Sequence, residues 1–124
     1  MTKRKAGDRG AVMVEFAIIL PILLMLVMGI IEFGRAYNTQ ISMQAAAREG
    51  ARALALGKSA AEVDTRVRDA APSVAIDSIS QTPCPSSGEG QARVVISESF
   101  TFGIPFVPLG TKTLTATGVM RCGL

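Results

Sequence analysis

The chain opens with a polar, basic stretch that gives way to an unbroken apolar run. The 21 residues of 11–31 contain a single charged side chain, Glu15. A helix of this length rises about 30 Å, which matches the hydrocarbon core of a bilayer. The pattern predicts a single-pass helix in the cytoplasmic membrane over 11–31. Because the basic residues precede it, the positive-inside rule places residues 1–10 in the cytoplasm and the C-terminal part outside.

Helical character continues past the apolar run. Glu32 and Arg35 are three residues apart, as are Glu49 and Arg52. This spacing puts opposite charges on one helical face, and the surrounding alanines favour a helix. We therefore expect one helix over roughly 11–56, half in lipid and half in water.

A seam of small residues runs along the soluble continuation of this helix, 32–57, which Gly57 is expected to end. Small side chains spaced about one turn apart let another backbone come close. The helix-packing residues of this seam are Ala47, Gly50, Ala51 and Ala55. Two interpretations stay open, namely cover by the chain's own C-terminal part and contact with another subunit.

The remainder, 58–124, predicts a small extracytoplasmic α+β domain. A short second helix is expected over 58–71, with Ser59 and Glu62 in the positions of a capping box. Alternating and β-branched runs predict three strands, at 74–79, 92–100 and 111–120. Turn-rich segments separate the strands, so the simplest arrangement is an antiparallel three-stranded meander packed on the helices. The predicted fold class is therefore α+β, with a long N-terminal helix, a short second helix and a small antiparallel sheet.

Both cysteines lie in the part expected outside the membrane. Cys84 follows the first predicted strand, and Cys122 comes at the end of the third. An even count in an oxidising compartment favours a disulfide. It would close a loop of roughly 40 residues and contribute about 4 kcal/mol. Free thiols are an alternative, whereas a metal site is disfavoured because two thiolates without histidine do not complete a tetrahedral site.

Charge and composition exclude several classes of function. The net charge of +3 comes from residues 1–10, so the body of the chain is formally neutral and offers no basic stripe to nucleic acid. The sequence has no histidine, which excludes Ser-His and Cys-His nucleophile pairs. It also has no phosphate-binding glycine loop with a lysine. We therefore expect no enzymatic activity, no cofactor, no nucleic-acid partner and no small-molecule substrate.

The acidic residue in the apolar run needs an explanation. A carboxylate deep in a bilayer is penalised by about 2.5–3.5 kcal/mol on insertion scales. Glu15 stands five residues after Gly10, which itself follows the basic leader. Two simple alternatives are a plain signal anchor and a signal peptide cut after Ala36. The signal peptide is disfavoured by the length of the apolar run and by the nearby Glu32.

Three blocks of sequence carry a more specific resemblance. They are EFAIILP at 15–21, GIIEFGRAY at 29–37 and AAAREGAR at 45–52. In this order and spacing they resemble the TadE-like family, the pseudopilins of tight-adherence (Flp-type) pilus systems. The likeness covers residues 9 to about 56. The C-terminal part matches no motif, so the TadE-, TadF- or TadG-like subgroup stays open.

The resemblance implies how such a chain would be processed and assembled. It implies that a prepilin peptidase removes the leader 1–10 by cutting after Gly10, which makes Ala11 the new N-terminus. Glu15, followed by Phe16, corresponds to the glutamate common to pilins, and its implied partner is the free amine of a neighbouring subunit. The alternative without an assembly role is that the Glu15 side chain reaches the membrane interface and pairs with nothing.

The implied function is that of a structural subunit that assists assembly of a type IV-like pilus in cell adhesion. The implied partners are the prepilin peptidase, other pilin-like subunits, the pilus assembly platform and membrane lipid. The runner-up is a signal-anchored envelope protein whose outer domain binds another envelope component.

Overall fold

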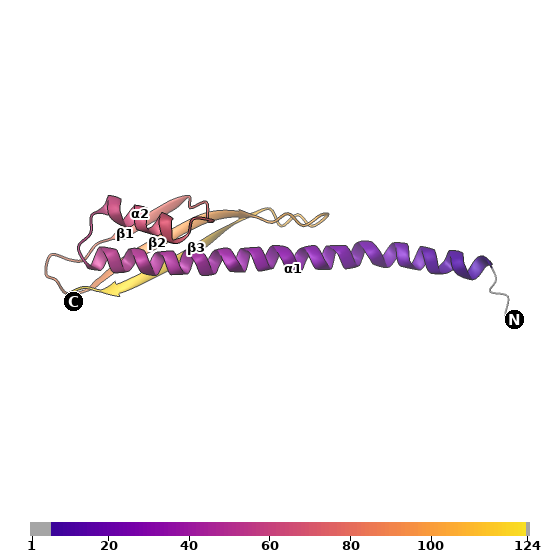
Figure 1. The fold of residues 1–124 in the computed structure, drawn as a ribbon, viewed down its shortest axis with the longest axis horizontal. Helices are drawn as coiled ribbons and strands as arrows, with labels where there is room; N and C mark the ends of the chain where they lie inside the picture. The colour runs from indigo at the N-terminus through magenta and orange to yellow at the C-terminus, as the bar shows by residue number, and fades with distance from the viewer. Residues whose placement is uncertain (1–5, 124) are drawn as a thin grey trace.

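The computed structural model describes residues 6–123. Three basic residues of the predicted leader, Lys3, Arg4 and Lys5, lie outside the described residues. The elements are α1 (Ala6–Ala55), α2 (Ala60–Ala70), β1 (Ser78–Thr82), β2 (Gln91–Thr101) and β3 (Thr111–Arg121). Figure 1 shows one long helix whose C-terminal half carries the second helix and the sheet, while its N-terminal half stands alone. The predicted α+β class is confirmed.

Helix α1 is continuous and begins earlier than predicted. The sequence pattern placed its start near residue 11, whereas the helix includes residues 6–10. Asp8 lies in the first turn, where a negative charge interacts favourably with the helix dipole. The helix continues through Pro21. It ends before Gly57, whose positive φ of 80° is the left-handed conformation that glycine adopts without steric cost.

One of the two ion pairs predicted on α1 is formed. Arg35 Nη1 lies 2.6 Å from Glu32 Oε1. The predicted pair of Glu49 with Arg52 is wrong, since Glu49 Oε1 lies 3.4 Å from Arg66 Nη1 of α2. An exposed pair within one helix contributes only a few tenths of a kcal/mol. Because α2 packs on α1, Arg66 lies close enough to pair with Glu49 in place of Arg52.

Helix α2 begins with the predicted capping box. The N–H of Glu62 donates to Ser59 Oγ at 3.3 Å, and the Glu62 carboxylate accepts the N–H of Ser59 at 3.2 Å. Val63 and Val67 are fully buried in the core. Ala70, three residues after Val67, is exposed.

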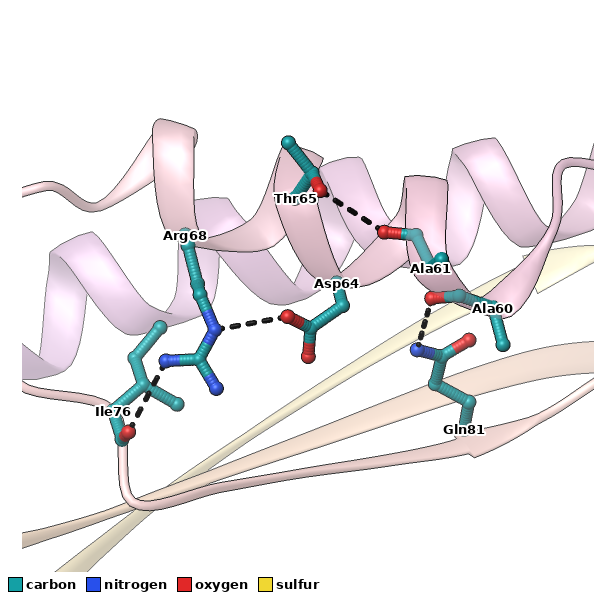
Figure 2. A network of polar contacts seen from close by, with 7 residues as sticks. All are labelled: Ala60, Ala61, Asp64, Thr65, Arg68, Ile76 and Gln81. Atoms are coloured by element: carbon teal, nitrogen blue, oxygen red, sulfur yellow. Dashed lines mark hydrogen bonds and ion pairs between the residues drawn. The ribbon is translucent and has the colours of Figure 1, made fainter.

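Polar contacts attach α2 to β1 and to the loop before it (Figure 2). Arg68 Nε donates to Asp64 at 2.9 Å, and Arg68 Nη1 donates to the carbonyl of Ile76 at 3.4 Å. Gln81 of β1 donates to the carbonyl of Ala60 at 3.0 Å. These bonds tie both ends of α2 to the side of the sheet that β1 forms.

The sheet is an antiparallel meander in the order β1-β2-β3, as predicted. Strand β1 begins at Ser78 rather than at residue 74. The residues before it form tight turns, in which the N–H of Val74 donates to Ala71 and the N–H of Ile76 donates to Val74, both at 3.1 Å. These local bonds use backbone groups that a strand would need for its partner, so strand pairing starts later.

The core lies between the C-terminal half of α1, α2 and one face of the sheet. Alternate residues of β2 are buried, as the two-residue period of a strand requires. The largest fully buried side chains are Met43, Val63, Val67, Val94 and Ile96.

Helix α1 also satisfies backbone carbonyls of the edge strand β3. Gln40 Nε2 donates to the carbonyl of Thr115 at 2.8 Å, and Gln44 Nε2 donates to that of Thr117 at 2.7 Å. Four residues of helix rise about 6 Å, and two residues of strand rise about 6.6 Å. The two glutamines therefore match alternate carbonyls of an edge that would otherwise be open to pairing with another chain.

Candidate functional site

The N-terminal half of α1 is an exposed apolar surface. By length and composition this is the one helix, among the residues described, that could cross a membrane, and its most apolar stretch has no buried residue. Phe16 is 63% exposed and Leu26 is 61% exposed. An apolar surface of this size is far larger than a soluble monomer leaves in water. This half of α1 therefore has the character of a single membrane anchor.

The predicted cleavage position lies in the first turns of α1. Gly10 and Ala11 are both helical and exposed, and no atom lies within 4 Å of where a Cβ on Gly10 would stand. A glycine inside a helix costs about 0.5–1 kcal/mol relative to alanine, which favours local unwinding. The peptide bond between these residues is thus open to approach and lies in a weakened turn.

Glu15 lies one helical turn after Ala11 and is exposed. Side chains on a helix lean toward its N-terminus, so the carboxylate of Glu15 is directed toward the level of Ala11. The rise between the two residues is about 6 Å. Among residues 6–123 the ion pairs are those of Glu32, Glu49 and Asp64, and Glu15 has none. A carboxylate without a partner therefore stands one turn from the position of the predicted new amine.

The small-residue seam of α1 is covered by the chain itself. Ala47 and Ala51 have no exposed surface, and Ala55 is half-buried. A Cβ on Gly50 would meet Val67 of α2 and Val94 of β2. The close approach that small residues allow is used here between α1 and the chain's own second helix and sheet.

The predicted disulfide is present. Cys84 follows β1, Cys122 follows β3, and their Cα atoms are 5.8 Å apart. The bond closes a loop with a sequence separation of 38 residues. It ties the end of the meander back to its first turn, at the end of the sheet far from the apolar half of α1 (Figure 1).

Glu32 joins α1 to the turn between β2 and β3, in addition to its predicted pair with Arg35. It lies directly after the apolar run and is buried, with 5% of its surface exposed. Besides the pair with Arg35, its Oε2 accepts the N–H of Gly103 at 2.9 Å. That N–H first, and the Arg35 guanidinium second, hold the pKa of Glu32 below its ordinary value of 4.5. The bond to Gly103 spans 71 residues of sequence, so no local pattern could have indicated it.

Comparison with known protein families finds a match for part of the chain. Residues 10–52 match the family model described as TadE-like protein. Neither a curated protein nor a solved structure matches the chain. The matched segment starts at Gly10 and follows α1 almost to its end, leaving out α2 and the sheet. Residues 10–52 are therefore a TadE-like domain, and its apolar N-terminal helix is consistent with a pilin-like subunit.

Proposed function

We propose that this chain is a pilin-like structural subunit that takes part in assembly of a tight-adherence, type IV-like pilus after a prepilin peptidase has cut it following Gly10. The observation that carries the proposal is the TadE-like match, which begins at Gly10 itself. The exposed apolar helix and the exposed carboxylate of Glu15 support it. The role is mechanical rather than enzymatic, because it consists of helix packing in lipid.

The proposal assigns a task to each part of the chain. Residues 1–10 are the cytoplasmic leader, and 11–31 span the cytoplasmic membrane. Residues 32–57 carry the helix outward, and 58–124 form the outer domain. The basic residues ahead of the apolar run support this orientation.

Cleavage would supply the positively charged partner that Glu15 lacks. Hydrolysis of the bond between Gly10 and Ala11 leaves a free amine on Ala11, which is protonated at neutral pH. A carboxylate in a low-dielectric medium favours any arrangement that brings an opposite charge close. The amine of the same chain lies one turn away, and the amine of a neighbouring subunit is available when the helices pack side by side. In the second case the pair would align two subunits in register, which is the assembly step we propose.

The N-terminus of the mature protein tests the processing step. We expect mass spectrometry of protein extracted from membranes with an active prepilin peptidase to give Ala11 as the first residue. Gly10→Leu should block the cut, whereas Gly7→Leu should be processed normally. Both glycines lie in the first turns of α1 with nothing within 4 Å of where a Cβ would stand, so the pair is matched in structure. An intact leader in the unmodified protein would instead indicate a signal-anchored envelope protein.

The carboxylate is tested separately from the cut. Glu15→Ala should be processed and folded, since Glu15 is exposed and forms no ion pair within the described residues, yet pilus assembly should fall strongly. Glu15→Asp, which keeps the charge, should retain much of the assembly. Normal piliation by a processed Glu15→Ala protein would remove the assembly role of this residue.

A further inference from the structure

The hairpin of β2 and β3 runs beside α1 toward the membrane-anchoring half. Near its base, Gln44 donates to the carbonyl of Thr117 at 2.7 Å. Near its far end, Glu32 accepts the N–H of Gly103 at 2.9 Å. Lower residue numbers on α1 thus meet residues closer to the turn of the hairpin. The hairpin is therefore held along α1 from the outer domain to the edge of the apolar run.

Aromatic packing fixes the last contact before the turn. The rings of Phe33 and Phe102 have centroids 5.4 Å apart, and those of Phe100 and Phe102 are 5.0 Å apart. The guanidinium of Arg35 lies 5.3 Å from the centroid of Phe100. Together with the Glu32 bond, these contacts join residues 32–35 of α1 to residues 100–103 of the hairpin. We call this group of contacts the collar, and the turn projects beyond it.

The turn, residues 103–110 (the hairpin tip), extends past this collar. Three residues of extended chain reach about 10 Å, and α1 covers that distance in about seven residues. Figure 1 shows the tip reaching past the middle of α1 toward the N-terminus. Met25 and Met28 are half-buried while most of their neighbours are exposed, as expected if the tip lies beside them. The tip therefore stands level with the outer end of the apolar run 11–31.

The tip itself is apolar throughout. Its sequence is GIPFVPLG, without a charged or hydrogen-bonding side chain. Phe106 is 94% exposed, and Val107 is 38% exposed. Phe106 has a φ of 63°, the one positive φ outside glycine among the described residues. A bulky residue in that conformation is costly, and here it presents an aromatic ring to the outside rather than to the core.

Five of the eight residues of the tip present no free backbone N–H group, which leaves only those of Ile104, Phe106 and Gly110 without a bond. Pro105 and Pro108 have no N–H to offer. The N–H of Gly103 donates to Glu32, that of Val107 to Ile104 at 3.3 Å, and that of Leu109 to Val107 at 2.9 Å. A lipid environment penalises unpaired backbone groups strongly, so a loop with few free N–H groups is suited to its border.

We propose that the hairpin tip is a second membrane contact, which dips into the outer-leaflet interface beside the helix that anchors the chain. The occupant of its apolar surface is phospholipid. The level of the tip against α1 argues for lipid, because any bilayer that covers 11–31 also reaches the tip. Interfacial elements bury their apolar faces about 5–10 Å into the headgroup and acyl boundary, which matches the reach of the tip. The contact would fix the depth and tilt of α1 relative to the bilayer.

This inference rests on α1 as the membrane anchor and needs neither cleavage nor a pilus. Its failure would leave the proposed processing after Gly10 untouched, and an uncleaved leader would leave the tip contact untouched. The two are therefore separable by experiment.

The chain has no tryptophan, so one introduced indole reports its own surroundings. We would reconstitute full-length Phe106→Trp, one copy per nanodisc, in phosphatidylcholine brominated either near the ester end or near the midplane. Ser87→Trp is the matched control, since Ser87 is exposed in the turn at the opposite end of the sheet. We expect blue-shifted emission for Phe106→Trp, with stronger quenching by the ester-proximal bromines, and no lipid quenching for Ser87→Trp.

Two results would overturn the proposal. Quenching of the Phe106→Trp indole by aqueous iodide to the same extent as the control would place the tip in water. A blue shift that brominated lipid does not quench would mean that the ring packs on protein, either α1 or the scaffold. Because each disc holds one copy, a second subunit cannot imitate lipid contact.

Discussion

Gly118 of β3 lies directly against the backbone carbonyl of Ala47 on α1. A Cβ at position 118 would overlap that carbonyl and crowd the N–H of Arg48. These are backbone atoms in the middle of a long helix, and they cannot swing aside as the end of a side chain does. The contact sets the distance between α1 and the sheet and thereby the course of the β2–β3 hairpin along the helix.

We expect Gly118→Ala to lower the free energy of unfolding of the outer domain by about 1–3 kcal/mol, the usual cost of overpacking. The measurement is the urea midpoint of the full-length protein in detergent, followed by pulse proteolysis. Gly34→Ala is the control, because nothing lies within 4 Å of a Cβ there and alanine suits a helix. Equal urea midpoints for the two variants would show that α1 and β3 can move apart to admit the added methyl group without loss of stability.

Loss of the disulfide should have a larger effect. Replacing both Cys84 and Cys122 by serine frees a loop with a sequence separation of 38 residues, and the loop-entropy relation gives about 4 kcal/mol for that length. The same urea series, with and without reductant, measures the loss. Reductant should shift the unmodified protein toward the double variant and leave the double variant unchanged. A shift of the double variant by reductant would point to an effect unrelated to this bond.

Local patterns predicted the elements of this fold well. The capping box of Ser59 and Glu62, the apolar run and the alternating strands depend on neighbours in sequence, and each was found where expected or within a few residues. Helix α1 begins earlier than predicted because Asp8 in its first turn interacts favourably with the helix dipole, which the apolar pattern does not report. Strand β1 began later because turn bonds near Val74 compete with strand pairing.

The tertiary contacts could not be predicted in the same way. Gln44 reaches Thr117 and Glu32 reaches Gly103 across more than 70 residues, and nothing in the local sequence distinguishes these residues from ordinary exposed polar ones. The position of the hairpin tip beside the apolar run follows from these contacts alone. The candidate processing and assembly residues, by contrast, came from family resemblance, which the match at 10–52 supports as a whole without testing each residue.

Glu98 should make the protein less stable as pH rises. It points into the core from β2, its Oε2 is buried without a hydrogen-bond partner, and burial, followed by the charge of Asp77, raises its pKa above 4.5. The folded state therefore favours the protonated acid, and stability falls as pH rises from 4.5 through the folded pKa. Glu98→Gln should be more stable than the unmodified protein at pH 7, on the order of 1 kcal/mol, and should lose this advantage below pH 4.5. Urea midpoints across pH test this, with exposed Glu89→Gln as the control.

Glu32 should give the opposite pH dependence, and only at the hairpin tip. Its pKa is lowered in the folded state, so its stabilising contribution is present above 4.5 and is lost as pH falls from there toward the folded pKa. Protonation weakens the bonds from Gly103 and Arg35 together and loosens the collar at the base of the tip. We expect hydrogen exchange of tip amides to be faster in Glu32→Gln than in the unmodified protein at pH 7, with core amides of β2 unaffected. The difference should shrink in samples labelled at low pH, after correction for intrinsic exchange. Equal tip protection in both proteins at pH 7 would mean that the collar does not depend on the charge of Glu32.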